Sequence, residues 1–364
     1  MKIIEITNYL ESLAPLFLQE DYDNSGFITG NKNWNLKNVL VCIDCNEEVV
    51  DEAIAKSCNL IVAHHPIVFN GLKSIVGKNY IERTIIKAIK NDIAIYAIHT
   101  NLDNIKDGVN STIANKIGLE NRKILRPRKD VINKLSFYCP VSDTQRLKKL
   151  LWDSGAGNIG NYSHCSFSSI GQGTFMGNDD SKPSLGQKNV LHKEKEEKVE
   201  MIIPSQLQNI ILDTLFSEHP YEEVAYEIHH LENINQDIGS GMFGKLKTPM
   251  KTNDFLMQLK KVMQTDCIRF TKLNKEYIET VAVCGGSGSF LLDDAKKAKA
   301  DIFITGDFKY HEFFDAEDDI IIADIGHYES EQFTKELICE ILNKKFTKFA
   351  THLSSINTNP INYM

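Results

Sequence analysis

The sequence predicts an α/β fold in which mixed or parallel sheets are covered by helices, interrupted by an inserted ferredoxin-like α+β domain. Two observations lead to this prediction. Short apolar segments alternate with helical segments in the first and last parts of the chain, and such alternation is typical of sheets covered on both faces. Between them the order becomes strand-helix-strand-strand-helix-strand, which is that of a ferredoxin-like unit. We expect residues 1–129 and 245–364 to form one discontinuous α/β domain, and residues 130–244 to form the inserted domain.

The composition indicates a globular protein and disfavours nucleic-acid-binding and membrane proteins. The chain has 364 residues, which is long enough for two domains, and its 42% hydrophobic content is ordinary for a globular protein. The net charge of -8 disfavours nucleic acid and anionic membranes as partners. The N-terminus has no signal-peptide core, and no window approaches the ~18 apolar residues of a membrane span, so we expect a cytoplasmic protein.

The eight cysteines are expected to be free thiols. We expect the single CxxC, Cys42–Cys45, to continue a strand rather than to carry redox or zinc chemistry.

The segments before the insert have clear boundary signals. Pro15 ends the first helix, Asn46 is placed to cap a helix, and Gly118 is placed to close another. The predicted order is helix 1–16, strand 39–44, a helix after Asn46, strand 60–63, helix 79–91, strand 93–98 and helix 107–117.

The insert and the segments after it are predicted in the same way. In the insert we expect strand 131–139, helix 143–153, strand 198–203, helix 205–217 and strand 224–229. The charged stretch 177–197 is expected to be a solvated loop that runs into a strand. After the insert, the sequence predicts helix 252–264, strands near 267–271 and 279–284, and a last long helix that begins after Gly326.

Four apolar segments end in histidine or carboxylate residues. Open α/β sheets place their ligands at the carboxyl ends of strands, so four such ends can converge on one site. The residues at these ends are His64 and His65, then His99 and Asp103, then Asp307 with Lys309 and His311 after it, and finally Asp324 and His327.

The adjacent pair His64 and His65 follows the apolar run Leu60–Ala63. Neighbouring side chains of an extended chain point to opposite faces, so the two histidines are poorly placed to bind one ion together. They could each bind one of two ions in a dinuclear centre. The alternative is a pair of capping or solvated histidines.

His327 and Glu331 are four residues apart at the start of the last helix, so their side chains share one face of its first turn. An ordinary helix start, with acidic residues at its positive end, is the alternative. With His64, His65 and Asp103 the set has three imidazoles and two carboxylates, one of which could bridge two ions. Such ligands suit Zn²⁺, Mn²⁺ or Fe.

The segment Cys284–Ser289 is a glycine-rich turn between a strand and a helix. Such a turn can present backbone N–H groups to an anion. It lacks the Gly-Lys-Ser/Thr of a Walker A loop, and we favour a tight turn over a phosphate site.

The motifs, in this order, resemble those of the GTP cyclohydrolase 1 type 2, or NIF-three-like, family. The resemblance covers about residues 1–125 and 245–364 and rests on Ala63–Pro66, His99–Asp103, Gly285–Gly288, Thr305–His311 and Gly326–Glu331. The family's usual Trp-Asp-Asn near the start is Tyr22-Asp23-Asn24 in this chain. The segment 130–244 resembles the PII-like or CutA-like insert of the longer bacterial members.

This resemblance implies a metal-binding protein. It implies two divalent metal ions per chain (Zn, Fe or Mn) and a homohexameric toroid. The ligands implied by the resemblance are His64, His65, Asp103, His327 and Glu331.

The resemblance also implies a function. We expect a metal-dependent hydrolase of a small-molecule substrate, either GTP or another nucleotide or phosphorylated compound; a cyclohydrolase would add water at C8 of guanine and release formate. His99 and His311 are the candidate catalytic residues, although both could instead orient metal ligands. Lys309 is the candidate substrate-binding residue, or a partner of Asp307. The other interpretation is a non-catalytic metal-binding scaffold or regulatory protein whose insert senses a ligand.

Overall fold

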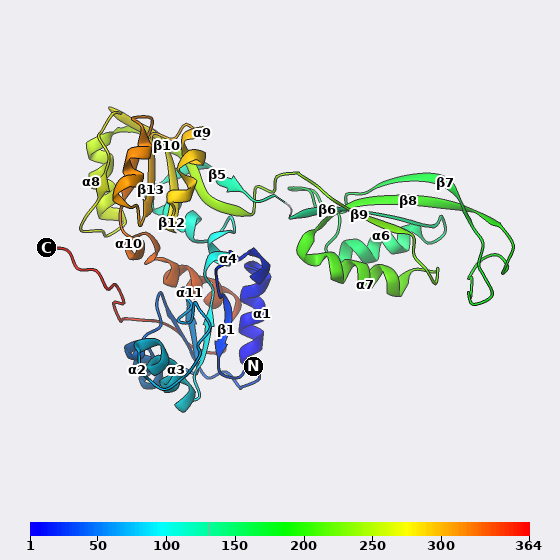
Figure 1. Ribbon diagram of the computed structural model, residues 1–364, viewed down its shortest axis with the longest axis horizontal. Helices are drawn as coiled ribbons and strands as arrows, with labels where there is room; N and C mark the ends of the chain where they lie inside the picture. The colour runs from blue at the N-terminus through cyan, green and yellow to red at the C-terminus, as the bar shows by residue number, and fades with distance from the viewer. Residues whose placement is uncertain (130) are drawn as a thin grey trace. The chain divides into compact units, whose positions relative to one another are not determined.

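The computed structural model describes residues 1–129 and 131–364. The chain divides into two compact units (Figure 1). One unit comprises Met1–Pro127 and Gln236–Met364, and the other comprises Arg128–Asn235. Each unit is described separately below.

The first unit contains a five-stranded sheet in the order β1-β4-β3-β2-β15. Neighbouring strands are parallel except for β1 and β4. The three central strands β2, β3 and β4 are buried at every position, as their uniformly apolar sequences predict. The strands are β1 (Gly26–Thr29), β2 (Val39–Cys42), β3 (Leu60–Ala63), β4 (Ala94–Ala97) and β15 (Thr351–Leu353).

Helices cover both faces of this sheet (Figure 1). Helices α1 (Ile3–Leu13) and α11 (Thr334–Lys345) pack on one face, and α2 (Glu47–Ala55) and α3 (Tyr80–Lys90) pack on the other. The Asn46 side chain accepts a hydrogen bond from the Val49 N–H, which confirms the predicted N-cap of α2.

A second sheet of the first unit has six strands in the order β11-β14-β13-β12-β10-β5. Its centre, β12 to β14, is parallel, and the outer strands are antiparallel. One hydrophobic core contains residues of both sheets, which explains why they belong to one compact unit. The strands are β5 (Leu119–Pro127), β10 (Gly239–Lys251), β11 (Arg269–Phe270), β12 (Tyr277–Ser287), β13 (Ile302–Gly306) and β14 (Ile321–Asp324).

Helices α5 and α8 pack against the shared core, while α9 and η4 contribute to a core on the opposite face of the second sheet. Two short helices, α4 and α10, begin within a few residues of the ends of β4 and β14. The bounds are α4 (Thr100–Asp103), α5 (Val109–Ile117), α8 (Thr252–Val262), α9 (Leu292–Lys297), α10 (His327–Glu331), η1 (Leu16–Leu18), η3 (Ser289–Leu291) and η4 (Tyr310–Ala316).

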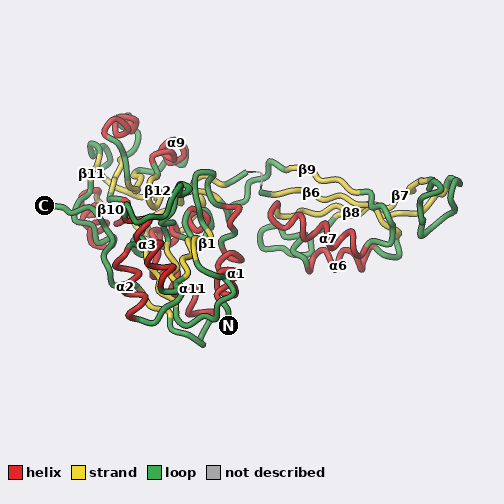
Figure 2. The backbone as a smooth tube through the Cα atoms, turned by 60° about the horizontal axis from the view of Figure 1, so that its bottom comes forward, coloured by secondary structure: helices red, strands yellow, loops and turns green. Residues whose placement is uncertain are grey.

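The second unit is an antiparallel sheet in the order β7-β8-β6-β9 with two helices on one face (Figures 1 and 2). Its core lies between the sheet and these helices. The elements are β6 (Ile132–Pro140), α6 (Thr144–Asp153), β7 (Phe167–Phe175), β8 (His192–Pro204), η2 (Ser205–Leu207), α7 (Gln208–Glu218) and β9 (Tyr226–His230).

Two details differ from the sequence-based expectations. Residues 239–244, expected in the insert, lie in β10 of the first unit because they pair with β5 and β12. Residues 193–197, expected in a loop, belong to β8 and pair with β7. Their alternating Lys and Glu side chains suit a strand with polar faces as well as a solvated loop, so composition alone did not distinguish the two.

Two further expectations concern the whole chain. All eight cysteines are free, as predicted, and Cys42 and Cys45 are buried beside or within β2. Among the helices of residues 1–129 and 131–364, none has the length and apolar character needed to cross a membrane.

Candidate metal centre

The candidate residues of the first unit meet at the carboxyl ends of its strands. His64 and His65 follow β3, His99 and Asp103 follow β4, and α10 carries His327 and Glu331 just after β14. Because strand ends from both sheets supply these side chains, the site lies where the two sheets face each other. It opens into a cavity of about 1110 Å³.

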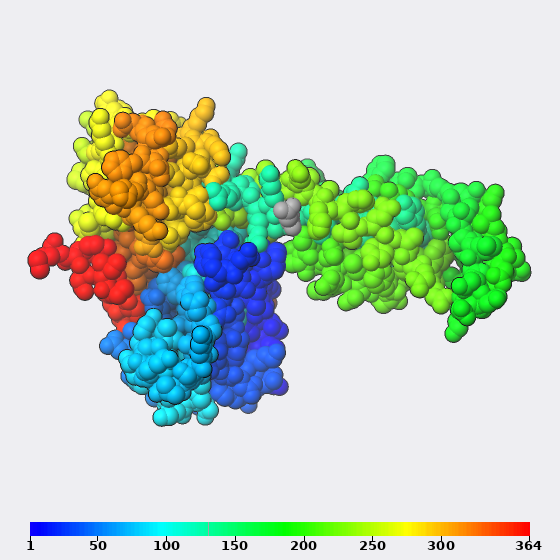
Figure 3. All heavy atoms as spheres, in the orientation of Figure 1, coloured from blue at the N-terminus to red at the C-terminus, as the bar shows by residue number. Residues whose placement is uncertain are grey.

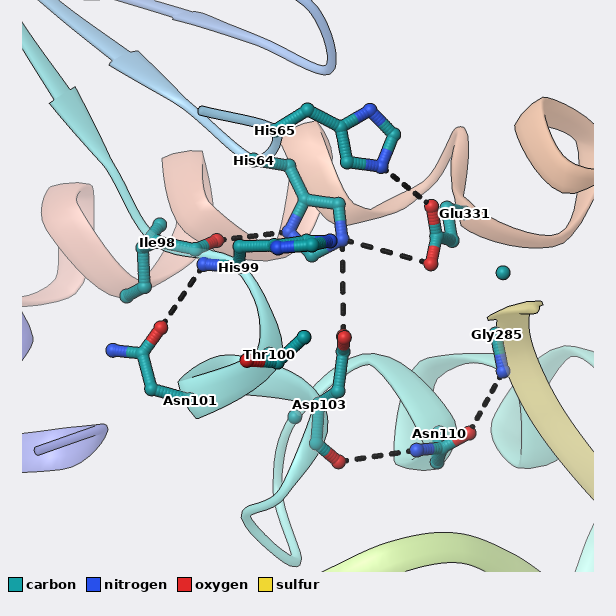
Figure 4. Close-up of polar contacts among 12 residues, drawn as sticks. His64, His65, Ile98, His99, Thr100, Asn101, Asp103, Asn110, Gly285 and Glu331 are labelled. Carbon is teal, nitrogen blue, oxygen red and sulfur yellow. Dashed lines mark hydrogen bonds and ion pairs between the residues drawn. The ribbon is translucent and has the colours of Figure 1, made fainter. Parts of the chain in front are cut away.

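The Nε2 atoms of the two adjacent histidines face different oxygens of Glu331. Their ring centroids are nevertheless only 4.9 Å apart, and both belong to one group that could hold a single ion, so the expectation that they are poorly placed to share an ion is not confirmed. His64 Nε2 lies 3.7 Å from Asp103 Oδ1 and 3.7 Å from Glu331 Oε1 (Figure 4). His65 Nε2 lies 2.9 Å from Glu331 Oε2 and 3.3 Å from His327 Nε2. The four-residue spacing predicted for His327 and Glu331 holds, with His327 Nε2 at 3.1 Å from Glu331 Oε2. Glu331 therefore directs one oxygen to each histidine of the pair.

The Nδ1 atoms of these histidines are held by oxygen atoms outside the cluster. His64 Nδ1 lies 2.8 Å from the Ile98 carbonyl, which can only accept, so this nitrogen donates the hydrogen bond. His65 Nδ1 lies 2.7 Å from Asp44 Oδ1, and His327 Nδ1 lies 2.7 Å from Asp307 Oδ2. Such partners fix the ring orientation of histidines that bind metals.

The electrostatics of the cluster favour a cation. Burial would lower the pKa of His65 and His327, but hydrogen bonds from His65 to Asp44 and Glu331 raise its pKa to about 9. Glu331 and Asp307 likewise raise the pKa of His327 to about 11. Burial would raise the pKa of Glu331, yet His327 holds it well below its usual range. Burial raises the pKa of Asp103 to about 7, against the opposing effect of His64.

Two buried atoms give a direct test of whether the residues fit a metal ion. His64 Nε2 and Asp103 Oδ1 have no hydrogen-bond partner among the described residues, and His64 is 0% exposed. A buried polar atom without a partner costs about 1–3 kcal/mol. A cation between them would satisfy both atoms. Imidazole and carboxylate ligands suit Zn²⁺, Mn²⁺ or Fe, so the residues fit a metal ion.

Among the described residues, three overlapping groups of side chains could hold a metal ion. In each group the ligand atoms lie within 4.8 Å of one another. The groups are His64, Asp103 and Glu331; His65, His327 and Glu331; and His64, His65 and His99.

His99 lies at the centre together with the expected ligands. Its ring centroid is 5.3 Å from that of His64 and 5.2 Å from that of His65. His99 Nδ1 lies 2.8 Å from Asp23 Oδ1, and hydrogen bonds from His99 and Thr100 hold the pKa of Asp23 below its usual range although burial opposes this. Burial lowers the pKa of His99 itself. A neutral ring that donates through Nδ1 leaves its other nitrogen able to accept a proton.

Lys309 and His311 are not brought to the centre. Both are exposed, and neither is among the described residues that line the cavity. The His311 ring contacts Tyr310 and Phe314 within η4. The Lys309 backbone N–H donates to Glu312 Oε2 at the start of the same helix. The loop between β13 and η4 thus places Asp307 beside His327, whereas Lys309 and His311 are exposed to solvent.

Sequence reasoning did not identify Asp23, Asp44 or Asp307 as the carboxylates that hold the histidine rings, although it placed Asp307 among the residues at strand ends. The position of Asp44 in the sequence could have identified it, since it stands just after the apolar strand β2. The candidate ligands likewise follow the apolar strands β3, β4 and β14. Asp23 does not follow an apolar strand, and the one feature that pointed to it was its place in Tyr22-Asp23-Asn24, the segment that corresponds to the family's Trp-Asp-Asn. Its 76-residue separation from His99 is bridged only in the folded chain.

The glycine-rich segment at the end of β12 serves close packing. The N–H groups of Gly285 and Gly286 donate to Asn110 Oδ1 and Ser330 Oγ. A Cβ at Gly286 would lie 2.5 Å from Glu331 Oε1, and the residue has φ +61°. The glycine therefore lets β12 approach Glu331. The expectation of a tight turn was wrong for residues 284–287, which belong to β12, where the pairing with β13 shifts register between Val283 and Ser287.

Comparisons with known proteins agree with these motifs. The family model of DUF34/NIF3 (NGG1p interacting factor 3) matches residues 1–360. A protein of Bacillus subtilis (strain 168) is 35% identical over 366 residues, which cover 99% of this chain and 98% of the relative. A protein of Halalkalibacterium halodurans is 36% identical over 365 residues, with 99% and 98% covered. Both are named "GTP cyclohydrolase 1 type 2 homolog".

Solved structures extend the agreement to the whole fold. A Bacillus cereus protein described as related to NIF3 is 36% identical, with a TM-score of 0.87 and coverage of 100% of this chain and 99% of that one. A Staphylococcus aureus protein is 29% identical, with a TM-score of 0.81 and the same coverage. With its motifs in the family order and its full length matched, the chain belongs to the DUF34/NIF3 family.

Proposed function

We propose that this protein is a dinuclear metal-dependent hydrolase of a small molecule, with GTP the first substrate to test because its curated relatives carry the cyclohydrolase name. The single observation that carries the proposal is the placement of Glu331. Its Oε1 faces His64, and its Oε2 faces His65 and His327. A carboxylate with its two oxygens divided in this way is suited to bridge two ions.

The distances support one ion on each side of Glu331. Ligands at the ~2.0–2.1 Å typical of zinc and arranged tetrahedrally lie about 3.3–3.4 Å from one another. His65 Nε2 and His327 Nε2 are 3.3 Å apart, and each lies 2.9–3.1 Å from Glu331 Oε2. On the other side, Asp103 would complete a group with His64 and Glu331. Ions bound there would supply activation of water and polarisation of the substrate.

His99 is the residue that we assign to proton transfer. It lines the cavity, whereas His64 is fully buried and its Nε2 faces Asp103 and Glu331. Asp23 orients the imidazole through Nδ1, and the lowered pKa of His99 keeps the ring neutral and able to accept a proton near pH 7. His311, exposed outside the cavity lining, is a weaker candidate for this role.

We also propose that the second unit is a PII-like or CutA-like module and that the protein assembles as a homohexamer. The order β-α-β-β-α-β and the antiparallel sheet β7-β8-β6-β9 support the first proposal. Native mass spectrometry of the full chain tests the second, and a monomer at micromolar concentration would contradict it.

The experiment that tests the proposed function measures metal content and turnover on the same preparations. We expect about two metal ions per chain, metal-dependent release of formate from GTP, and loss of both in a His64→Ala/Glu331→Ala variant. A His229→Ala/Glu340→Ala variant removes the same residue types from exposed positions and should keep both. Two bound ions without turnover of any nucleotide in a broad panel would favour the metal-binding scaffold. Preparations without metal would contradict the proposed centre.

A further inference from the structure

Aromatic side chains gather around the cavity in front of the candidate metal centre. Four of them line it while remaining 44% to 68% exposed to solvent. Large exposed aromatic groups that surround one cavity mark a binding surface, because each offers a flat apolar face that water solvates poorly. The four residues are Tyr22, Phe69, Tyr80 and Phe290.

Apart from His65 and His327, which belong to the candidate metal centre, the charged side chains that line the same cavity are acidic. Glu20, Asp44, Glu47 and Glu48 line it together with the candidate ligands Asp103 and Glu331. No Lys or Arg lines it within the part of the chain that the structure describes. The nearby Arg83 pairs with Glu47 through a 2.8 Å bond, and Arg126 is held by Asp294 and the Phe290 carbonyl. The walls outside the metal centre therefore repel an anion.

The backbone N–H groups of the glycine-rich segment do not replace basic side chains in the lining. The glycine-rich segment of β12 is the part of the lining with the composition of an anion-binding loop. Its Gly285 and Gly286 N–H groups already donate to Asn110 and Ser330. Protein sites for phosphate chains use basic side chains or free N–H groups of this kind, and the cavity supplies neither from these positions.

From these features we propose that the metal centre acts on a planar, uncharged heteroaromatic compound of nucleobase or nucleoside size, and that the cavity disfavours a polyphosphate chain. The inference rests on the proposed function and narrows its substrate class. A nucleoside triphosphate with its base at the metal ions would place its phosphates in a cavity whose acidic lining includes Glu20, Glu47 and Glu48. The uncharged nucleoside would instead gain stacking on the aromatic side chains and hydrogen bonds to neutral lining groups such as Asn70 and Ser287.

The test is a binding measurement on the full-length, metal-loaded protein with guanosine and GTP as probes. Isothermal titration calorimetry at low salt should give at least about ten-fold tighter binding of guanosine. The difference should shrink at high salt, because salt screens the repulsion between phosphates and carboxylates. Repeating the titration after removal of the metal should widen the difference, since the ions themselves attract phosphate.

Variants distinguish the contribution of aromatic stacking to guanosine binding from the effect of the acidic side chains on GTP binding. Tyr22→Ala and Phe290→Ala should each weaken guanosine binding by about ten-fold, whereas Phe314→Ala, an exposed aromatic residue outside the lining, should not. A Glu47→Gln/Glu48→Gln variant should strengthen GTP binding several-fold and leave guanosine unchanged.

The outcomes are distinct. Tighter binding of GTP than of guanosine in metal-free protein, or no binding of guanosine at millimolar concentration, would overturn the inference. An equal loss in the Phe314→Ala variant would do the same. Guanosine that binds as expected but is not turned over would contradict the hydrolase proposal while supporting the inference about the cavity.

Discussion

Thr358, near the C-terminus, donates a 2.7 Å hydrogen bond to Asp44 Oδ2. The other oxygen of Asp44 accepts from His65 Nδ1, also at 2.7 Å. The last residues of the chain thus hold the partner of a candidate metal ligand. The same segment is attached to the first unit by Ser354 and Ser355 at Glu52 and by Asn359 at Glu329, and Figure 3 shows these C-terminal residues (red) at the surface of that unit.

The first prediction follows from this contact. Thr358→Val should lower metal affinity by about ten-fold or more, because loss of the hydrogen bond frees Asp44 and with it the His65 ring. Metal titration with a competing chelator measures the change. Thr358→Ser keeps the hydroxyl and should restore wild-type affinity, and Thr248→Val at an exposed position is the matched control. Unchanged affinity in Thr358→Val would show that the C-terminal segment does not position the ligand.

The second prediction concerns Gly286. Gly286→Ala places a Cβ 2.5 Å from Glu331 Oε1 at φ +61°, so Glu331 must move and metal content should fall. Gly118→Ala is a close control, since its φ is +83° but nothing lies within 4 Å of the added Cβ. Both variants should lose about 1–2 kcal/mol of unfolding free energy from backbone strain. Only Gly286→Ala should lose metal, as measured by elemental analysis, and equal metal content in the two variants would contradict the assigned role.

The third prediction separates His99 from the metal ligands. His99→Gln should keep the bound metal and lower turnover by about 10²–10⁴-fold, the usual contribution of a general acid or base. Elemental analysis and initial rates on one preparation give both quantities, and His229→Gln in the second unit serves as the control. If His99→Gln loses metal in proportion to activity, His99 is a ligand, as its place in the group with His64 and His65 allows.

The fourth prediction is a dependence of stability on pH. Burial would raise the pKa of Glu52, but hydrogen bonds from Lys56, Ser354 and Ser355 lower it from 4.5 to about 2. A carboxyl group with a lowered folded-state pKa stabilises the fold above its unfolded pKa, and this stability is lost as pH falls through the folded pKa. Glu52→Gln should therefore cost about 1–3 kcal/mol above pH 5, and the difference should disappear towards pH 2. Chemical denaturation across this range checks it, and a difference independent of pH would contradict the ionic role of Glu52.

The sequence by itself determined the local features of the first unit. Uniformly apolar runs predicted β3 and the neighbouring strands, because burial on both faces leaves no polar position in a strand. Histidines and carboxylates, which are common metal ligands, follow these apolar runs in the sequence. The candidate metal ligands were therefore identified before any contact was known; they are His64, His65, Asp103, His327 and Glu331. The spacing of His327 and Glu331 also predicted their shared face, since one helical turn sets it.

Only the tertiary structure decided how these pieces combine. Glu331 divides its oxygens between His64 and His65 only because the fold brings distant segments together, since His65 and Glu331 are 266 residues apart. The assignment of the strands to two sheets, the limits of the second unit at β10, and the outward position of His311 depend on pairing and packing of the same kind. Hydrophobic periodicity specifies which face of a segment is buried but not which segment covers it. The carboxylates Asp23, Asp44 and Asp307 were therefore recognised as partners of the histidines only in the folded protein.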